Sequence, residues 1–501
     1  MRLALVAHIV GLILRYFGLI LILPLVVDYF YGNEEESLGF IVAGIVASLL
    51  GEIMRRLHPG GADLTRVEGL AVVTVVWLVV AGCGAIPYVW SGMGVIDSLF
   101  ESMSGFTTTG ATVMRDFSIY SRGIFFWRSL TQWLGGLGVI ALFIAVLPKL
   151  AIAGRQLFFA EAPGPAEERL TPRIRHTAIA LWKIYGGLTL IQVILLKAVG
   201  MPLYDAVCNS LTTLSAGGFS PHPASIAGYE NPAAEWIFTL FMFLAGANFS
   251  LQYFVLRGSP KRFLQDEEFR IYTGIALSAG LLLSFALYQF SLSPTVAYLS
   301  ADTSTQPLSA ASLQTILRQA FFQVVSILTT TGFATDDFNL WSDRAKVVLL
   351  ILMFIGGSAG SAGGGPKVVR ILLIIKYAVS ELFRAVHPQA VKPIRLNNRV
   401  VSAEILRSIT AFLLLYLLMF TLSVLIIALF GSDLITALTA SIATLGNIGP
   451  GFGTVGPMAN FAHFHPIVKV VLFFNMWIGR LEVMTVIVLL QPHIWRGTRI
   501  R

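Results

Sequence analysis

The stretch Phe106-Thr107-Thr108-Thr109-Gly110-Ala111-Thr112 ends an apolar run with small hydroxyl residues and a glycine. Three altered copies follow it: LSAGGF at 214–219, TTTGFA at 329–334 and LGNIGPG at 445–451. We call these stretches segments one to four. Their glycines lie about 110 residues apart, which indicates a chain built from four repeats. The glycines placed at equivalent positions are Gly110, Gly217, Gly332 and Gly449.

The composition is typical of a membrane protein. Of the 501 residues, 56% are hydrophobic and 12% are charged, and the mean hydropathy is +0.77. A soluble chain of this length needs far more charge to cover its surface. Many apolar runs exceed the about 18 residues of a spanning helix, and the alternating pattern of an outer-membrane barrel is absent. The first run, 3–27, is too long for a signal peptide. We therefore expect an all-α polytopic membrane protein.

Charge and rare residues exclude several classes of function. The net charge of +8 indicates basic cytoplasmic loops and contact with membrane lipid, not nucleic-acid binding. Cys83 and Cys208 alone imply no disulfide framework. The eight histidines form no H-E-x-x-H motif and no cluster with metal-ligand spacing. The sequence therefore predicts neither an enzyme nor a bound cofactor.

One unit repeats along the chain: a long helix, a short half-helix, a glycine-rich segment and a long return helix. The half-helices are expected at 97–106, 205–214, 315–328 and 433–445, and the return helices at 123–147, 234–256, 346–379 and 466–490. The predicted divisions are two extra N-terminal helices at 1–62 and pore repeats at 63–160, 161–262, 263–392 and 393–501. This pattern predicts ten transmembrane helices plus four re-entrant pore helices.

The half-helices are too short to span a bilayer. Asp97, Asp205 and Asp433 open three of them and can cap their N-termini. The negative ends of their dipoles then point at the glycine-rich segments, which favours a cation at mid-membrane. Arg55 and Arg56 end the second helix, and the positive-inside rule places them in the cytoplasm. With ten spans, both termini then lie in the cytoplasm.

Four such segments around one axis predict a pore lined by backbone carbonyls. A dehydrated cation needs oxygen ligands in place of water, and glycine lets the backbone approach closely. The alternative is that the segments are small-residue motifs for helix packing. We disfavour it, because packing motifs lie within long helices and these segments follow short ones.

A glycine-rich run interrupts the return helix of repeat three. It cannot remain helical, since each glycine costs about 1 kcal/mol relative to alanine, and Pro366 suits a restarted helix. We expect a mobile gate below the pore segments; a close-packing kink or a turn at the membrane edge is the alternative. The predicted gate residues are Gly356, Gly357, Ser358, Ala359, Gly360, Ser361, Ala362, Gly363, Gly364 and Gly365.

Three polar residues interrupt apolar return helices. Arg480 should face the protein interior or water, and if it faces the pore axis it would repel cations and limit conduction; a structural ion pair with Glu482 or another acid is the alternative. Arg128 and Gln132 line the cavity or stabilise helix contacts, and we favour the structural role.

The residues 100–112, 128–136 and 156–165, with 170–174, resemble the Trk/Ktr/HKT superfamily of potassium-uptake proteins. The two extra N-terminal helices resemble its TrkH branch and not the shorter KtrB branch. The resemblance covers essentially the whole chain. It implies a potassium-channel-like pseudo-fourfold pore, a homodimer in the bacterial inner membrane and a cytosolic ring of TrkA-type nucleotide-binding subunits.

The resemblance also assigns roles to residues. It implies potassium ligands at Thr108, Thr109, Gly110, Ser215, Ala216, Gly217, Thr330, Thr331, Gly332, Asn447, Ile448 and Gly449. It places a gating loop at 356–365 and a pore-facing arginine at Arg480. Glycine in all four segments resembles the potassium-preferring members, whereas segments two and four depart from the full Thr-Thr-Gly pattern.

The expected function is conduction of K⁺ and Rb⁺ as the membrane subunit of a Trk-type uptake system. A secondary transporter that couples potassium or another solute to Na⁺ or H⁺ is the alternative. Inverted repeats would favour it, but these four units have the same orientation.

Overall fold

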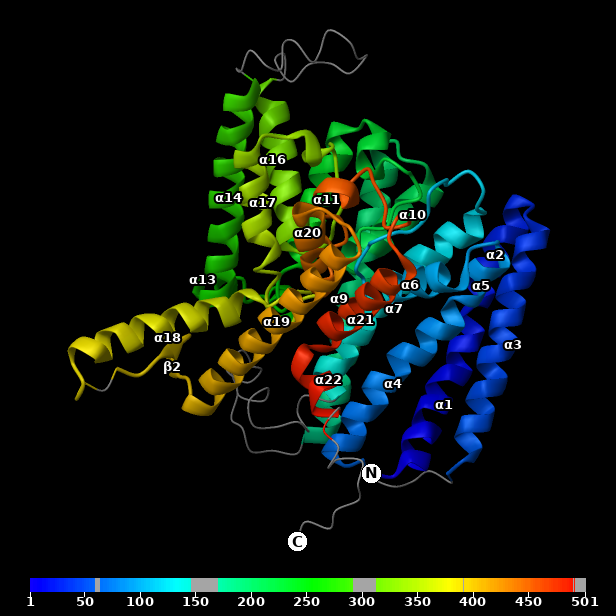
Figure 1. Cartoon of the computed structure of the whole chain (residues 1–501), viewed down its shortest axis with the longest axis horizontal. Helices are drawn as coiled ribbons and strands as arrows, with labels where there is room; N and C mark the ends of the chain where they lie inside the picture. The colour runs from blue at the N-terminus through cyan, green and yellow to red at the C-terminus, as the bar shows by residue number, and fades with distance from the viewer. Residues whose placement is uncertain (59–63, 146–169, 292–311, 391, 490, 492–501) are drawn as a thin grey trace.

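The computed structural model describes residues 1–58, 64–145, 170–291, 312–390, 392–489 and 491 (Figure 1). The stretch 156–165, which resembles the cytoplasmic link of the superfamily, and the repeat boundary at 160/161 lie outside these residues. The described chain is dominated by α-helices.

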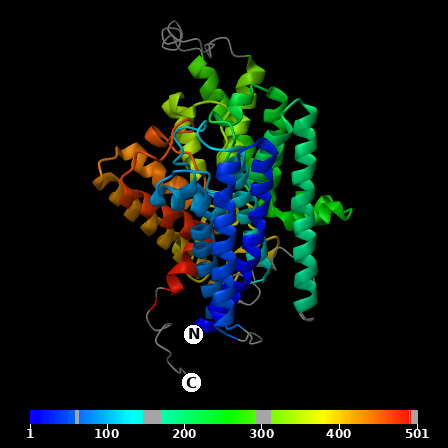
Figure 2. The same ribbon diagram turned by 90° about the vertical axis from the view of Figure 1, so that its right-hand side faces the viewer.

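The chain begins with a helical hairpin. Helices α1 (Leu3–Ile20) and α2 (Ile22–Tyr31) form one span, and α3 (Glu34–Arg56) returns beside it. The hairpin packs closely through glycines: a Cβ atom on Gly11 would lie 2.5 Å from the carbonyl oxygen of Gly51. Both views show α1 and α3 side by side (Figures 1 and 2). Both are candidate membrane spans, and the N-terminal division at 1–62 stays a prediction.

Four helical units follow. The first contains α4 (Arg66–Gly84), α5 (Ile86–Trp90), α6 (Val95–Phe106) and α7 (Arg122–Ala145). The second contains α9 (Leu170–Ala198), α10 (Leu203–Leu214), η1 (Ser225–Tyr229), α11 (Pro232–Ala245) and α12 (Phe249–Leu256). The third contains α13 (Lys261–Gln265), α14 (Glu267–Ser291), α16 (Leu313–Leu328), η3 (Phe338–Leu340), α17 (Asp343–Met353) and α18 (Val368–Val386). The fourth contains the strands β1 (Arg395–Leu396) and β2 (Arg399–Val400), then α19 (Ala403–Leu429), α20 (Leu434–Leu445), η4 (Gly453–Val455), α21 (Pro466–Leu481) and α22 (Val483–Leu489).

The short helices α6, α10, α16 and α20 stand where half-helices were expected, and most of their side chains are buried. Six helices among the described residues are long and apolar enough to cross a membrane, and two bent pairs raise this number to 8. The fold is thus a helical membrane protein. The count of ten spans stays a prediction.

Two return helices expected to be continuous are broken. In repeat two, α11 and α12 meet at 102°, and in repeat four α21 and α22 meet at 108°. Asn248 starts α12 by accepting a hydrogen bond from the Ser250 amide at 2.7 Å, and Glu482 adopts a left-handed φ of 66° between α21 and α22. The third break, between α17 and α18, lies where the glycine-rich run predicted it. Figure 1 shows α18 running across the upright direction of α14.

The expected aspartate caps are correct at one helix only. Asp433 accepts a hydrogen bond from the Thr436 amide at 3.0 Å at the N-terminus of α20. Helices α6 and α10 begin two residues before Asp97 and Asp205, so these carboxylates lie in the first turn without capping it. They still face the positive end of the helix dipole. Asp97 instead accepts a hydrogen bond from Lys469 Nζ at 2.6 Å.

Candidate functional site

All four half-helices end in the same backbone turn. An amide beyond each helix reaches back five residues, from Thr109 to Ser104, Gly217 to Thr212, Thr331 to Ser326 and Ile448 to Ala443, at 2.8–2.9 Å. The preceding amide reaches back three residues in every case. This pair of bonds defines a Schellman motif. The segments therefore share one backbone conformation despite different sequences.

The turn places a left-handed residue at the same point of each segment. The φ angles are 51° at Thr108, 55° at Ala216, 59° at Thr330 and 54° at Asn447. Glycine normally takes this position, so Thr and Ala there are strained. Such strain is concentrated at functional sites and persists only where the surroundings hold it. Thr and Ala do not favour left-handed backbone, so this turn could not be predicted from the sequence of segments one to three.

Two residues later, each segment has a glycine with positive φ, and these glycines form a closed ring. A Cβ atom on Gly110 would strike the carbonyl of Gly217, and one on Gly218 would strike the carbonyl of Thr331. A Cβ atom on Gly332 would strike the carbonyl of Ile448, and one on Gly449 would meet the carbonyl of Thr109. Each segment thus contacts the next, and the fourth contacts the first. Only glycine permits this approach.

The ring corrects the alignment of segment two. The glycine equivalent to Gly110, Gly332 and Gly449 is Gly218, with a φ of 76°, and not Gly217. The residues structurally equivalent to Thr108, Thr109 and Gly110 are accordingly Ala216, Gly217 and Gly218. Ser215 lies one position earlier, at the helix C-cap. Two adjacent glycines concealed this shift of one residue.

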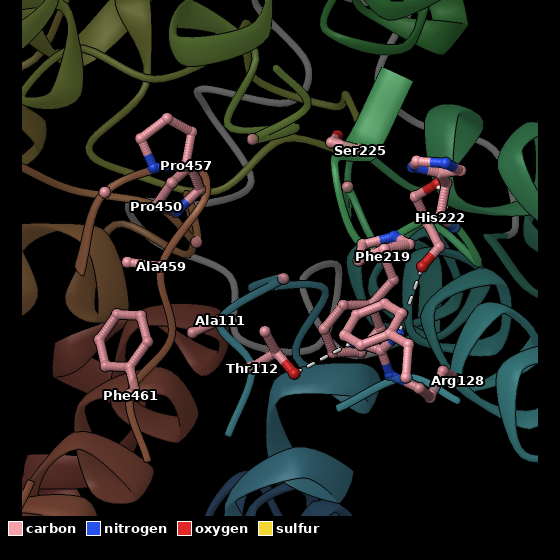
Figure 3. Close-up of a pocket in the computed structure, with 18 residues that line it drawn as sticks. Ala111, Thr112, Arg128, Phe219, His222, Ser225, Pro450, Pro457, Ala459 and Phe461 are labelled. Atoms are coloured by element: carbon pink, nitrogen blue, oxygen red, sulfur yellow. Dashed lines mark hydrogen bonds between the residues drawn. The ribbon is translucent and has the colours of Figure 1, made fainter. Parts of the chain in front are cut away.

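The four ring glycines line one cavity of about 70 Å³ (Figure 3). Its wall also includes Phe219 of segment two, Pro450 of segment four and, further along the chain, Phe461. Arg128 is at its edge and donates hydrogen bonds to Thr112 Oγ1 at 3.2 Å and to the Ser220 carbonyl at 3.4 Å. The cavity is therefore a partly open space beside the ring.

A buried ion pair supports segment one. Arg128 on α7 lies 2.8 Å from Glu101 on α6, and both side chains are almost fully buried. Glu101 also accepts hydrogen bonds from Thr112 Oγ1 at 3.0 Å and from the Val113 amide at 2.9 Å. The structural role favoured for Arg128 agrees with these contacts.

The loop between α17 and α18 lies against the inner ends of the segments. The Gly364 amide donates to Thr330 Oγ1 at 2.6 Å, and a Cβ atom on Gly364 would lie 2.6 Å from the Gly446 carbonyl. The loop also fills the break in repeat two: the Ser358 and Ala362 amides donate to the carbonyls of Gly246 at 2.9 Å and Ala245 at 3.1 Å. The glycine-rich run is thus a defined loop directly beside segments three and four.

Charged residues fix this loop from several sides. Arg480 Nη1 donates to the Ala362 carbonyl at 2.9 Å, and its Nε and Nη2 have no hydrogen-bond partner among the described residues. Glu482 pairs with Arg370 at 2.6 Å, so the alternative ion pair of Arg480 with Glu482 is wrong. Arg480 is 5% exposed, which places a poorly compensated cation beside the loop.

Two further loop contacts were not expected. Lys367 is buried, and its Nζ donates to the Gly363 carbonyl. Glu268 accepts hydrogen bonds from the Ala359 amide at 2.7 Å and the Val369 amide at 3.2 Å. Both residues flank apolar runs in the sequence, where they look like ordinary loop charges. Within the described ranges, no group of three or more His, Cys, Asp or Glu residues could hold a metal ion.

Comparison with known proteins identifies close relatives of this architecture. A family model described as "TrkH: Cation transport protein" matches residues 40–496. The Trk system potassium uptake protein TrkH of Salmonella typhimurium is 39% identical over 499 residues, which cover 98% of this chain and 99% of that protein. The Trk system potassium uptake protein TrkG of Escherichia coli is 32% identical, with 98% of each chain covered. The crystal structure of the potassium transporter TrkH from Vibrio parahaemolyticus superimposes with a TM-score of 0.87 at 33% identity, covering 99% of this chain and 100% of that one.

Proposed function

Because the chain belongs to the TrkH family of cation transport proteins, we propose that it is the potassium-translocating membrane subunit of a Trk-type uptake system. The coarse activity, transport of a cation across a membrane by a polytopic helical protein, follows from the family. The proposal adds the route of the ion, its selection and its gate.

The closed ring of glycines carries this proposal. Four backbone segments approach one another more closely than any side chain would allow, and their half-helices direct negative dipole ends at them. Such a ring can replace the water of a dehydrated cation with carbonyl and hydroxyl oxygens. The proposed ligands are the residues that the resemblance implies, together with Gly218 in segment two. Ser215, the C-cap of α10, is at the edge of this set.

The loop at 356–365 is the proposed gate. It contacts segments three and four through Gly364, and Arg480 holds it at Ala362. A loop with this much glycine moves at low energetic cost, and a buried guanidinium beside the path repels cations. Displacement of the loop would therefore open the path and move positive charge away from it.

The repeats favour a channel-like route over an ion-coupled secondary transporter. All four segments have the same turn in the same chain direction, whereas inverted repeats are typical of many coupled transporters. A strict requirement for a Na⁺ or H⁺ gradient would support the coupled alternative.

The orientation and partners remain part of the proposal. Helix α3 ends at Arg55 and Arg56. In Figure 1 this end is at the bottom of the molecule, as is the N-terminus, and α22 lies in the lower half. By the positive-inside rule, the proposed orientation in the inner membrane has both termini on the cytoplasmic side. A homodimer and a cytosolic TrkA-type ring complete the proposed assembly.

The proposal is tested by flux through liposomes that contain the purified protein. We expect K⁺ and Rb⁺ to pass faster than Na⁺ and Li⁺, with empty liposomes as the control. Equal flux of all four ions, or no flux in the presence of the partner ring, would contradict it.

A further inference from the structure

In segments one and three, a hydrogen bond joins the hydroxyl groups of two threonines. Thr107 Oγ1 lies 2.8 Å from Thr109 Oγ1, and Thr329 Oγ1 lies 2.7 Å from Thr331 Oγ1. The first threonine of each pair also donates to a carbonyl of its half-helix, at 2.6 Å for Thr107 and 2.8 Å for Thr329. Each pair therefore ties the segment to the end of its half-helix.

Segment two has a hydroxyl residue at the first of these two positions but not at the second. Ser215 stands in the place of the first threonine and donates to the Leu211 carbonyl at 2.9 Å. The second threonine is replaced by Gly217, which is followed by Gly218. Two adjacent glycines have no side chain with which to fix their carbonyls and have the greatest backbone freedom.

Gln132 of α7 fills the missing place. Its Nε2 donates to the Gly217 carbonyl at 2.7 Å, and its Oε1 accepts a hydrogen bond from the Phe219 amide at 3.1 Å. A Cβ atom on Gly217 would strike the carboxamide carbon and oxygen of this side chain. The amide of repeat one thus occupies the space that a threonine side chain would take in segment two.

An amide also ties segment four, which lacks the threonine pair. Asn447 Nδ2 donates to Thr109 Oγ1 at 2.9 Å and to the Met476 carbonyl at 2.9 Å. Both segments without the threonine pair are therefore tied by a carboxamide. Asn447 belongs to its own segment, whereas Gln132 comes from another repeat, so the sequence around segment two does not reveal its support.

We propose that Gln132 is a positioning residue for ion selectivity, because it substitutes for the absent side chain of segment two and fixes the Gly217 carbonyl. This inference rests on the proposed function. The Gly217 carbonyl faces Gly110 in the ring, so its direction sets one wall of the path. Without Gln132, the Gly217-Gly218 pair can adjust to ions of other sizes, and discrimination falls although the path remains open.

The test compares Gln132→Met with Gln192→Met in liposomes. Gln192 on α9 is also fully buried and donates to Thr213 Oγ1 at 3.1 Å. Thr213 belongs to α10, the half-helix that precedes segment two, so this bond does not involve segment two itself. We expect the K⁺/Na⁺ flux ratio to fall about fivefold in Gln132→Met, the equivalent of one hydrogen bond, and to stay unchanged in Gln192→Met. Equal ratios in both variants would overturn the inference.

A compensating pair of substitutions separates positioning from simple stability. Gln132→Ala opens the space beside Gly217, and Gly217→Thr then restores a hydroxyl pair with Ser215. Gly217 lacks a positive φ, so its backbone accepts threonine. We expect the double variant to regain most of the K⁺/Na⁺ ratio lost in Gln132→Ala, and a ratio no better than that of the single variant would overturn the inference.

Two further results have fixed meanings. If Gln132→Met does not accumulate as folded protein, the double variant is compared directly with the unmodified protein, and a much lower K⁺/Na⁺ ratio counts against the inference. An unmodified protein that passes no K⁺ contradicts the proposed function itself. An unmodified protein that selects K⁺, with a Gln132→Met variant that selects it equally well, contradicts only the role of Gln132.

Discussion

Arg480 in the last span donates a hydrogen bond to the carbonyl oxygen of Ala362, in the middle of the loop that interrupts repeat three, at 2.9 Å. The two residues are 118 positions apart in sequence. Among the described residues, this is the only hydrogen bond that the Arg480 guanidinium makes, so the charge and the loop are expected to move together.

Replacement of Arg480 by Gln is expected to raise K⁺ flux. The variant loses both the repulsive charge and a charged hydrogen bond, which is worth about 1.5–3 kcal/mol and corresponds to at least about a tenfold change. Rubidium uptake into liposomes measures it. Arg480→Lys is the matched control, since it keeps the charge and loses the guanidinium geometry. Flux in Arg480→Gln at or below that of the unmodified protein would contradict the gate.

Shortening the loop by removing residues 358–364 is expected to raise flux as well. The deletion removes Gly364, which contacts Thr330 and Gly446, together with the Ala362 carbonyl that Arg480 binds. The same liposome assay measures the effect, and thermal melting checks that the protein is folded. Unchanged flux in a folded variant would remove the loop from the gating mechanism.

Gly332→Ala is expected to lower K⁺ flux at least about fivefold, since left-handed backbone alone costs about 1–2 kcal/mol for an L-residue. The added methyl group would also strike the Ile448 carbonyl of the neighbouring segment. Gly186→Ala on α9 is the control, because a Cβ atom there meets nothing within 4 Å. Similar flux in the two variants would show that the ring does not carry the ion.

Glu101→Gln is expected to destabilise the protein by about 3–5 kcal/mol, because it leaves Arg128 buried without its counter-charge. Thermal melting in detergent measures the loss. The double variant Glu101→Gln/Arg128→Met is expected to lose less stability than the sum of its single variants. Additive losses would contradict a direct coupling between the two side chains.

Asp433 makes the stability of α20 depend on pH. The hydrogen bond from Thr436 holds the pKa of this carboxyl below its ordinary value of 3.8. The folded state therefore binds the proton less readily than the unfolded state. The cap stabilises the protein above about pH 4 and is lost as the pH falls through the lowered pKa. Melting of the unmodified protein and of Asp433→Asn should converge at acidic pH, and a constant difference would contradict this assignment.

The sequence was sufficient for the repeats and the half-helices, since glycine spacing and short apolar runs define both. It also located the break in repeat three, because a run of glycines cannot remain helical. The breaks at Asn248 and Glu482 escaped detection, since neither lies in a comparable run. Their backbone angles depend on tertiary contacts with the loop and with Arg370.

The alignment of segment two needed coordinates for a different reason. Gly217 and Gly218 are chemically identical, and only their backbone geometry distinguishes them: Gly218 has a φ of 76°, whereas Gly217 lacks a positive φ. The support from Gln132 was equally inaccessible, because it crosses between repeats. A glutamine in an apolar helix indicates burial, but it does not identify the carbonyl that it binds.

The four segments of the ring belong to a single polypeptide, and different side chains hold them in place. A threonine pair holds segments one and three, Asn447 holds segment four and Gln132 holds segment two. In a tetramer of identical subunits, one mutation alters every wall at once. Here a single mutation can change one segment and leave the other three unaltered, so ion preference can change in small steps under natural selection.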